Sequence, residues 1–247
     1  MILQAEESLV FHREPCWCYS AGGMLVLAAL LAMAQGGARP STAEEWKKLG
    51  VSYASQGKHE EAGEPFREAC RMAPDDPDAC YFHGRNLYAL NRFGSALKVL
   101  EEQLRRRSDG RVLLAAAQAL EALGRASESE GRFEDAIRST LKPLRPEDDP
   151  RLHYGVFLIR QGRAKEAVQE LVRAQPSARA LAETGRALSQ LDRTAEAAAA
   201  LEKALALDPR HWTAHLLLGK AYLRLGRAAE AEPHLRLGEK GLTTEGR

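Results

Sequence analysis

The feature of the sequence that most constrains the fold is a pattern of residues that returns about every 34 residues. In the segment 43–76 the pattern consists of Trp46, Leu49, Gly50 and Tyr53, followed by Ala62, Phe66, Ala69 and Pro74. The first four residues lie on one stripe of a helix, and the others lie on a second helix. A large residue opposite a small one lets two antiparallel helices approach, and proline ends the second helix. The pattern therefore predicts a chain of helix pairs.

The same residue types recur at the same offsets in later segments. The segment 178–211 repeats them clearly, with Gly185 and Leu201 at two of the positions, and 77–109 repeats them more loosely. The predicted units are 43–76, 77–109, 110–147, 148–177, 178–211 and 212–245. One helix pair cannot bury its own apolar side, so such units must stack on one another. We therefore expect a single array of about six units over residues 43–245.

Three departures from the pattern predict local changes. In the third unit, the residues that match the second helix of the pattern are Gly131 and Ala136, several positions later than expected. This predicts an insertion at about residues 124–130, between the two helices of the unit. The fourth unit is about four residues short, which predicts a shorter second helix or turn. In the last unit Gly238 and Gly241 predict a frayed final helix.

Residues 43–245 resemble the tetratricopeptide repeat family, and the first unit matches its signature at every position. Leucine, alanine, arginine and glutamate dominate the composition and β-branched residues are scarce, which also favours helix over strand. The resemblance implies an all-α fold, a right-handed α-solenoid of helix-turn-helix repeats with a concave groove. It also implies a protein that binds other proteins.

The segment 1–38 differs from the rest of the chain. No residue between Glu14 and Arg39 is charged, and residues 24–34 form a dense apolar run that is shorter than the ~20 residues needed to cross a bilayer. This predicts a signal-peptide-like or membrane-anchor segment at 1–38, joined through the linker 39–42. One feature disagrees, because Glu6 and Glu7 stand where an export signal should be positive.

Three interpretations of this segment stay open. It is a signal peptide whose true start is Met24, an uncleaved membrane anchor, or a buried helix that caps the fold. The first two place the rest of the chain in the periplasm, either free or anchored to the inner membrane. The third leaves a cytoplasmic protein.

The repeats leave no room for a catalytic domain, so we expect neither an enzyme nor a cofactor. His211 and His215 have the spacing of two metal ligands on one helix, but they lack a third ligand, and we expect no metal site. The chain has 35 Lys and Arg against 34 Asp and Glu. This balance argues against nucleic-acid binding, which needs an excess of cations on one face.

Cys70 and Cys80 fall at the end of one predicted helix and the start of the next. A disulfide between them would join the first two units. It requires Cα atoms within ~7 Å and an oxidising compartment. The alternative is that both are small buried apolar residues.

The family resemblance implies that the first helix of each pair lines the groove. The groove residues that it assigns in this chain are Lys47, Tyr81, Arg85, Tyr88, Gln118, Leu152, Val156, Ile159, Arg186 and Lys220. Such a surface suits a peptide or protein segment with an acidic group that meets Arg85 or Arg186. The clamp by which co-chaperone members hold a chaperone's C-terminus is absent, because Val51 and Phe82 stand at its asparagine positions.

These observations predict a non-catalytic adaptor or scaffold that binds a protein or peptide partner in the groove. Two alternatives remain. Because the last unit lacks an obvious polar capping helix, apolar residues such as Leu235 and Leu242 could pack on a second copy in a self-associating assembly unit. A regulatory subunit of an envelope complex is also compatible with the pattern.

Overall fold

The computed structural model describes residues 39–140, 143 and 145–245, and in this part of the chain it contains twelve α-helices, one short 3-10 helix and no strand. The predicted fold class, an α-solenoid of helix pairs, is confirmed. The predictions made for residues 1–38 lie outside the described residues. Among the helices that are described, none combines the length and apolar character needed to cross a membrane.

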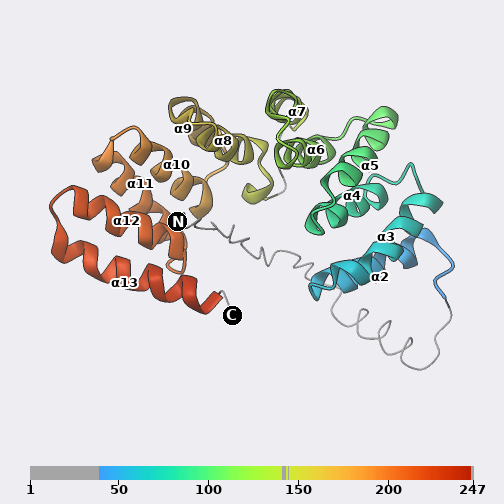
Figure 1. Cartoon of the computed structure of the whole chain (residues 1–247), viewed down its shortest axis with the longest axis horizontal. Helices are drawn as coiled ribbons and strands as arrows, with labels where there is room; N and C mark the ends of the chain where they lie inside the picture. Colours follow the sequence, from blue (N-terminus) through green and yellow to red (C-terminus); the bar gives the residue numbers. More distant parts are fainter. Residues whose placement is uncertain (1–38, 141–142, 144, 246–247) are drawn as a thin grey trace, which may run out of the picture.

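The helices form six antiparallel pairs that stack in an arch (Figure 1). The even-numbered helices are α2 (Ala43–Ser55), α4 (Ala79–Ala89), α6 (Gly110–Ala122), α8 (Pro150–Arg160), α10 (Ala178–Gln190) and α12 (Trp212–Arg224). Their partners are α3 (His59–Met72), α5 (Phe93–Arg106), α7 (Ala126–Ser139), α9 (Ala164–Arg173), α11 (Thr194–Leu207) and α13 (Ala228–Glu245). From α4 to α10, the even-numbered helices lie toward the inside of the arch.

In five of the six pairs, a glycine of the first helix packs directly against a large side chain of the second, whereas in the third pair Ala117 of α6 holds that position and shares a core cluster with Phe133. A Cβ atom added at Gly50 would lie 2.6 Å from the Phe66 ring, and one at Gly185 would lie 2.6 Å from Cγ of Leu201. Gly84, Gly155 and Gly219 stand in the same relation to the leucine of their partner helices. The repeated small and large residues of the sequence are therefore the contacts that hold each pair together.

The core continues from one pair to the next. Its largest cluster of buried side chains includes Leu113 of α6, Phe133 of α7, Leu152 of α8, Leu171 of α9 and Ala180 of α10. Smaller clusters connect α2 and α3 to α4, and α10 and α11 to α12 and α13. Each helix pair thus buries its apolar side against its neighbours, as a stacked array requires.

The prediction of an insertion within the third pair was wrong. Helix α7 already begins at Ala126, and Ser129 occupies the position that Ala62 holds in α3. The buried Ser129 hydroxyl donates a hydrogen bond to the carbonyl oxygen of Ala117 (2.9 Å), so a polar residue fits where the pattern has alanine. The additional residues follow α7 instead, in the segment 140–149, which contains the 3-10 helix Pro146–Asp148.

The fourth pair is shortened in its second helix, as its length predicts, since α9 has 10 residues whereas α7 and α11 have 14. The predicted fraying of the last helix was wrong, because α13 continues through Gly238 and Gly241 for 18 residues. A Cβ at Gly238 would lie 2.8 Å from the backbone nitrogen of Leu216. This glycine therefore lets α13 approach α12 closely.

The first two pairs are joined by sulfur atoms as well as by packing. Cys70 in the last turn of α3 and Cys80 in the first turn of α4 have Cα atoms 4.5 Å apart and sulfur atoms within bonding distance, at 2.07 Å. The disulfide closes the short connection between the two helices. Its formation in the protein depends on an oxidising compartment.

The glycine contact can be tested with a matched pair of substitutions. We expect Gly185→Ala to lower the free energy of unfolding by about 1–3 kcal/mol, because the methyl group must displace Leu201. Gly131→Ala, in the middle of α7 with no atom near its added Cβ, should raise it by about 0.5–1 kcal/mol through helix propensity. Chemical denaturation followed by circular dichroism measures both. Equal effects of the two substitutions would contradict the packing that we describe.

The disulfide predicts resistance to alkylation. In protein prepared under oxidising conditions, mass spectrometry should find Cys70 and Cys80 unmodified by iodoacetamide until a reductant is added. The paired substitution Cys70→Ser and Cys80→Ser should lower stability by about 2–3 kcal/mol, because the cross-link restricts the unfolded chain. Alkylation of both residues without reductant would exclude the disulfide.

Candidate binding face

The candidate site is the surface that the even-numbered helices turn toward the inside of the arch, called here the concave face (Figure 1). Residues one helical turn apart share a face of a helix. In α4 this places Tyr81, Arg85 and Tyr88 together. Positions on the same face of α2, α6, α8, α10 and α12 supply the other predicted groove residues, among them Lys47 of α2.

A chain of hydrogen bonds runs across three of these helices. Arg85 of α4 donates from Nη1 to Oε1 of Gln118 in α6, at 2.8 Å. Nε2 of Gln118 lies 3.1 Å from Nδ1 of His153 in α8, and Nε2 of His153 lies 2.8 Å from the carbonyl oxygen of Glu147. Arg85, Gln118 and His153 therefore form one connected set, which we call the polar relay.

The protonation state of His153 determines which atom donates and which accepts in each hydrogen bond of the relay. Burial and the nearby Arg179 and Arg85 guanidinium groups lower the pKa of His153 to about 4, so the ring is neutral near pH 7. Because a carbonyl oxygen can only accept, Nε2 of His153 donates to Glu147 and Nδ1 accepts from Gln118. The amide oxygen of Gln118 is then free to accept from Arg85.

The relay holds Arg85 without neutralising it. Its partner Gln118 is an uncharged amide, and among the described residues no carboxylate lies within ion-pair distance of Arg85. The side chain is half-buried on the concave face. A fixed cation of this kind can bind a carboxylate with two parallel hydrogen bonds.

The other predicted cations are placed differently. Lys47 lies 2.9 Å from Asp76 and 2.8 Å from Glu44, and Arg186 forms an ion pair with Glu183 of its own helix. Lys220 is exposed, with no ion pair among the described residues. The structure therefore favours Arg85 over Arg186 as the anion-binding residue.

The aromatic residues flank Arg85 on α4. Tyr81 is half-buried beneath the Arg111 guanidinium, whose Cζ lies 5.2 Å from the ring centroid. The ring of Tyr88 lies 5.1 Å from that of Phe93, and burial raises the pKa of its hydroxyl group. Both rings keep part of their surface accessible beside the cation.

The structure does not place the three predicted aliphatic groove residues on an open surface. Leu152, Val156 and Ile159 are 0%, 7% and 5% exposed, and all belong to the largest core cluster. Helix α8 has neighbours in α6, α7, α9 and α10, so its side chains are covered on several sides. The predicted groove residues that keep an accessible surface therefore include those of α4 and α6.

Sequence reasoning missed His153. Its neighbour Leu152 has the offset of a groove residue, and nothing in the local pattern indicates that the histidine bonds across to Gln118. The cross-helix ion pair of Arg160 with Glu121, at 2.9 Å, was missed for the same reason. Both contacts join residues more than 30 positions apart.

The histidines near the C-terminus have structural partners. His211 accepts a hydrogen bond from the backbone of Ala214 at the start of α12, and Nδ1 of His215 lies 2.8 Å from Nδ1 of His234. Nε2 of His215 lies 3.1 Å from the carbonyl oxygen of Pro209. No group of three or more potential metal-ligating side chains occurs in the part of the chain that the structure covers.

Comparison with known families gives a match over most of the chain. The model described as tetratricopeptide repeat matches residues 26–77, 81–150 and 182–240. A search of curated protein sequences gave no match.

Solved structures with repeat folds are also similar. A protein from Thermus thermophilus, described as a thermophilic TPR protein, has 21% identity and a TM-score of 0.60, over 74% of this chain and 100% of that one. The Cut9-Hcn1 assembly of the APC/C has 18% identity and a TM-score of 0.71, over 90% of this chain but 43% of that one. YrrB, described as a TPR protein with an unusual peptide-binding site, has 19% identity and a TM-score of 0.53, over 71% and 91%. At these identities the similarity shows the fold alone.

The relay predicts how stability depends on pH. The unfolded state binds a proton at His153 below about pH 6.5, whereas the folded state resists protonation until about pH 4, so the free energy of unfolding falls as the pH drops through this window. We expect His153→Gln, which keeps an amide donor and acceptor, to make this loss smaller by about 1–3 kcal/mol at pH 4. Denaturation curves at several pH values measure the difference. Parallel pH profiles for the two proteins would contradict a neutral, half-buried His153.

Proposed function

Because the chain belongs to the tetratricopeptide repeat family, we propose that it is a non-catalytic adaptor that binds a protein or peptide partner on its concave face. Almost all of the described residues belong to stacked helix pairs. This architecture presents a long surface for such a partner. Similarity to YrrB, itself described as having a peptide-binding site, supports the same class of function.

The observation that carries the proposal is the un-neutralised charge of Arg85. Arginine side chains elsewhere on this surface are paired with carboxylates, as in Arg160 with Glu121 and Arg111 with Asp78. Arg85 is instead held in place by an amide, with Tyr81 and Tyr88 one turn away on either side. The partner segment therefore carries a carboxylate, from an acidic side chain or a C-terminus, next to apolar or aromatic groups.

We also propose that residues 43–245 work in an oxidising compartment, the periplasm or the periplasmic side of the inner membrane. The juxtaposition of Cys70 and Cys80 supports this location, because disulfides persist there and are rare in the cytosol. A cytoplasmic location is the alternative, and reduced cysteines in protein isolated from cells under alkylating conditions would favour it.

A second candidate function is self-association through the last helix pair. Leu223, Leu225 and Leu237 are 50%, 37% and 44% exposed there, so this end of the array presents leucine side chains that a second copy could cover. Light scattering separates the two functions. A monomer at micromolar concentration excludes self-association, whereas a discrete dimer that Leu223→Glu dissociates would support it.

The adaptor proposal predicts a strong effect of reversing one charge. Partners are captured from envelope extract on immobilised residues 39–247 and identified by mass spectrometry. We expect Arg85→Glu to weaken retention of the specific partner at least about tenfold, since it repels the carboxylate that Arg85 would bind. Lys165→Glu, which reverses an exposed and unpaired charge on α9, is the matched control and should leave retention unchanged.

Two results would contradict this proposal. One is equal retention by the Arg85→Glu and Lys165→Glu variants when circular dichroism shows both to be folded. The other is capture of the partner by residues 1–38 alone, which would move the binding function out of the repeats.

A further inference from the structure

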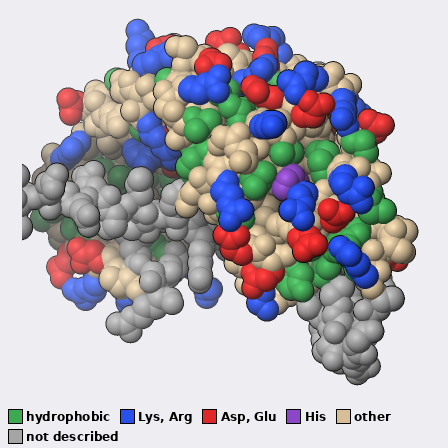
Figure 2. All heavy atoms as spheres, turned by 45° about the vertical axis from the view of Figure 1, so that its right-hand side comes forward, with side chains coloured by type: hydrophobic (Ala, Val, Ile, Leu, Met, Phe, Trp, Pro, Cys, Tyr) green, Lys and Arg blue, Asp and Glu red, His purple; other side chains and the backbone are tan. Residues whose placement is uncertain are grey.

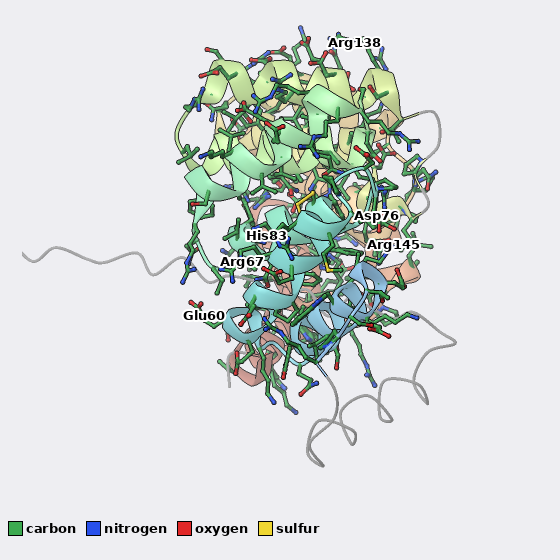
Figure 3. All side chains as sticks on the ribbon, turned by 90° about the vertical axis from the view of Figure 1, so that its right-hand side faces the viewer. Glu60, Arg67, Asp76, His83, Arg138 and Arg145 are labelled. Atoms are coloured by element: carbon green, nitrogen blue, oxygen red, sulfur yellow. A yellow bond between two sulfur atoms is a disulfide. The ribbon has the colours of Figure 1, made fainter. Side chains whose placement is uncertain are left out.

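A second concave surface lies between the outer helices α3 and α5, on the side of α4 that faces away from Arg85. We call it the outer groove. It has a volume of about 910 Å³, and it is lined by residues of α3, α4 and α5 from Glu60 to Arg106. In Figure 3, Glu60 and Arg67 of α3 and His83 of α4 lie on this side of the molecule.

The floor of the outer groove is mostly apolar, with the polar ring of His83, whose Nδ1 is buried without a hydrogen-bond partner among the described residues, as an exception. It contains the Cys70–Cys80 disulfide, His83, Leu87 and Val99. Burial and the positive charge of Arg67 lower the pKa of His83 to about 4, so its ring is neutral near pH 7. The floor can therefore accept an apolar side chain.

The rim of the outer groove carries an excess of positive charge. Six basic side chains line the groove, namely Arg67, Arg71, Arg92, Lys98, Arg105 and Arg106, whereas the acidic ones are Glu60, Glu64 and Glu102. Figure 2 shows the right-hand side of the array, where lysine and arginine side chains stand around hydrophobic side chains and a histidine.

Internal ion pairs do not remove this excess. Arg105 and Arg106 share the single carboxylate of Glu102, and Arg67 and Arg71 share that of Glu68, at 3.8 and 2.9 Å. Lys98 has no carboxylate within ion-pair distance among the described residues. Arg92 is paired with Glu60 at 3.0 Å, so the charge available to a ligand comes from Lys98 and from the arginines that share a carboxylate.

The shape and composition of the groove indicate which class of anionic ligand it could bind. Single-stranded nucleic acid binds on aromatic platforms, and no Phe, Tyr or Trp lines the groove. A membrane surface meets convex or flat basic patches, whereas here the apolar floor is recessed between two helices. A peptide segment can enter the recess and bring carboxylates to both sides of it.

We propose that the outer groove is a second docking site, which binds a short segment of a partner protein in which acidic residues flank an apolar side chain. The apolar side chain enters the floor beside His83 and Leu87. The carboxylates meet Arg67 on α3 and Lys98 on α5. This site is independent of the concave face, so the adaptor would hold two segments at once, one on each side of the array.

The test uses the full chain under oxidising conditions and a short fluorescein-labelled peptide in which leucine alternates with glutamate. Fluorescence anisotropy measures binding at low salt. We expect saturable binding that the double substitution Lys98→Glu and Arg67→Glu weakens at least about tenfold. Ser95→Trp, at an exposed position on the groove wall, should abolish binding by filling the recess.

The controls keep the experiment specific to this groove. The matched double substitution Lys165→Glu and Lys203→Glu reverses two exposed, unpaired charges on the outer helices α9 and α11 and should leave peptide binding unchanged. Arg85→Glu should also have no effect, which separates this site from the concave face. A peptide with lysine in place of glutamate should not bind.

Three outcomes would overturn the proposal. They are the absence of saturable binding, equal weakening by the groove substitutions and the matched control, and binding to vesicles of anionic phospholipid that the groove residues control while the peptide does not bind. The last outcome would assign the outer groove to a membrane surface. None of the three depends on whether the concave face binds its own partner.

Discussion

The packing of a glycine on one helix against a large apolar side chain on the next is the contact on which this structure depends. It fixes how closely the two helices of a pair approach, and the apolar residues that two helices alone cannot cover are buried against the neighbouring pairs. Repetition of this contact in five of the six pairs, from Gly50 to Gly219, with Ala117 in the third pair, produces an arch with two different sides. The concave face and the outer groove both follow from that geometry.

The repeated contacts could be predicted from the sequence because they depend on residues close together in the chain. Gly50 and Phe66, for example, are 16 positions apart at a fixed offset. The third pair was misassigned because Ser129 replaces the expected alanine, and only the structure shows its hydroxyl bonded to Ala117. The relay was beyond prediction, since Gln118 and His153 are 35 positions apart and meet only after the third and fourth pairs have stacked.

Most charges on the surface are arranged in local pairs, which makes the exceptions informative. An arginine just before each of α7, α9, α11 and α13 pairs with the glutamate three residues later, as in Arg125 with Glu128 and Arg227 with Glu230. Exposed pairs of this kind contribute little stability and leave little net field. Arg85 on the concave face and Lys98 at the outer groove lack such partners among the described residues. Other unpaired cations of the described chain, such as Lys165 and Lys203, stand exposed on the outer helices. Arg85 instead lies beside tyrosine rings, and Lys98 lines a groove with Leu87 and Val99, which is why we propose these two as the sites for a ligand's carboxylates.

The central claim is that the six pairs form one continuous stack, including across residues 140–149. Native-state hydrogen exchange followed by mass spectrometry tests it most directly. Because the largest core cluster spans α6 to α10, the amides of α6 and α8 should exchange together and more slowly than those of α2 and α13. If α8 instead exchanged as fast as the segment 145–149, or if the helices before and after that segment exchanged as two independent groups, the chain would be two separate bodies and the account would be wrong.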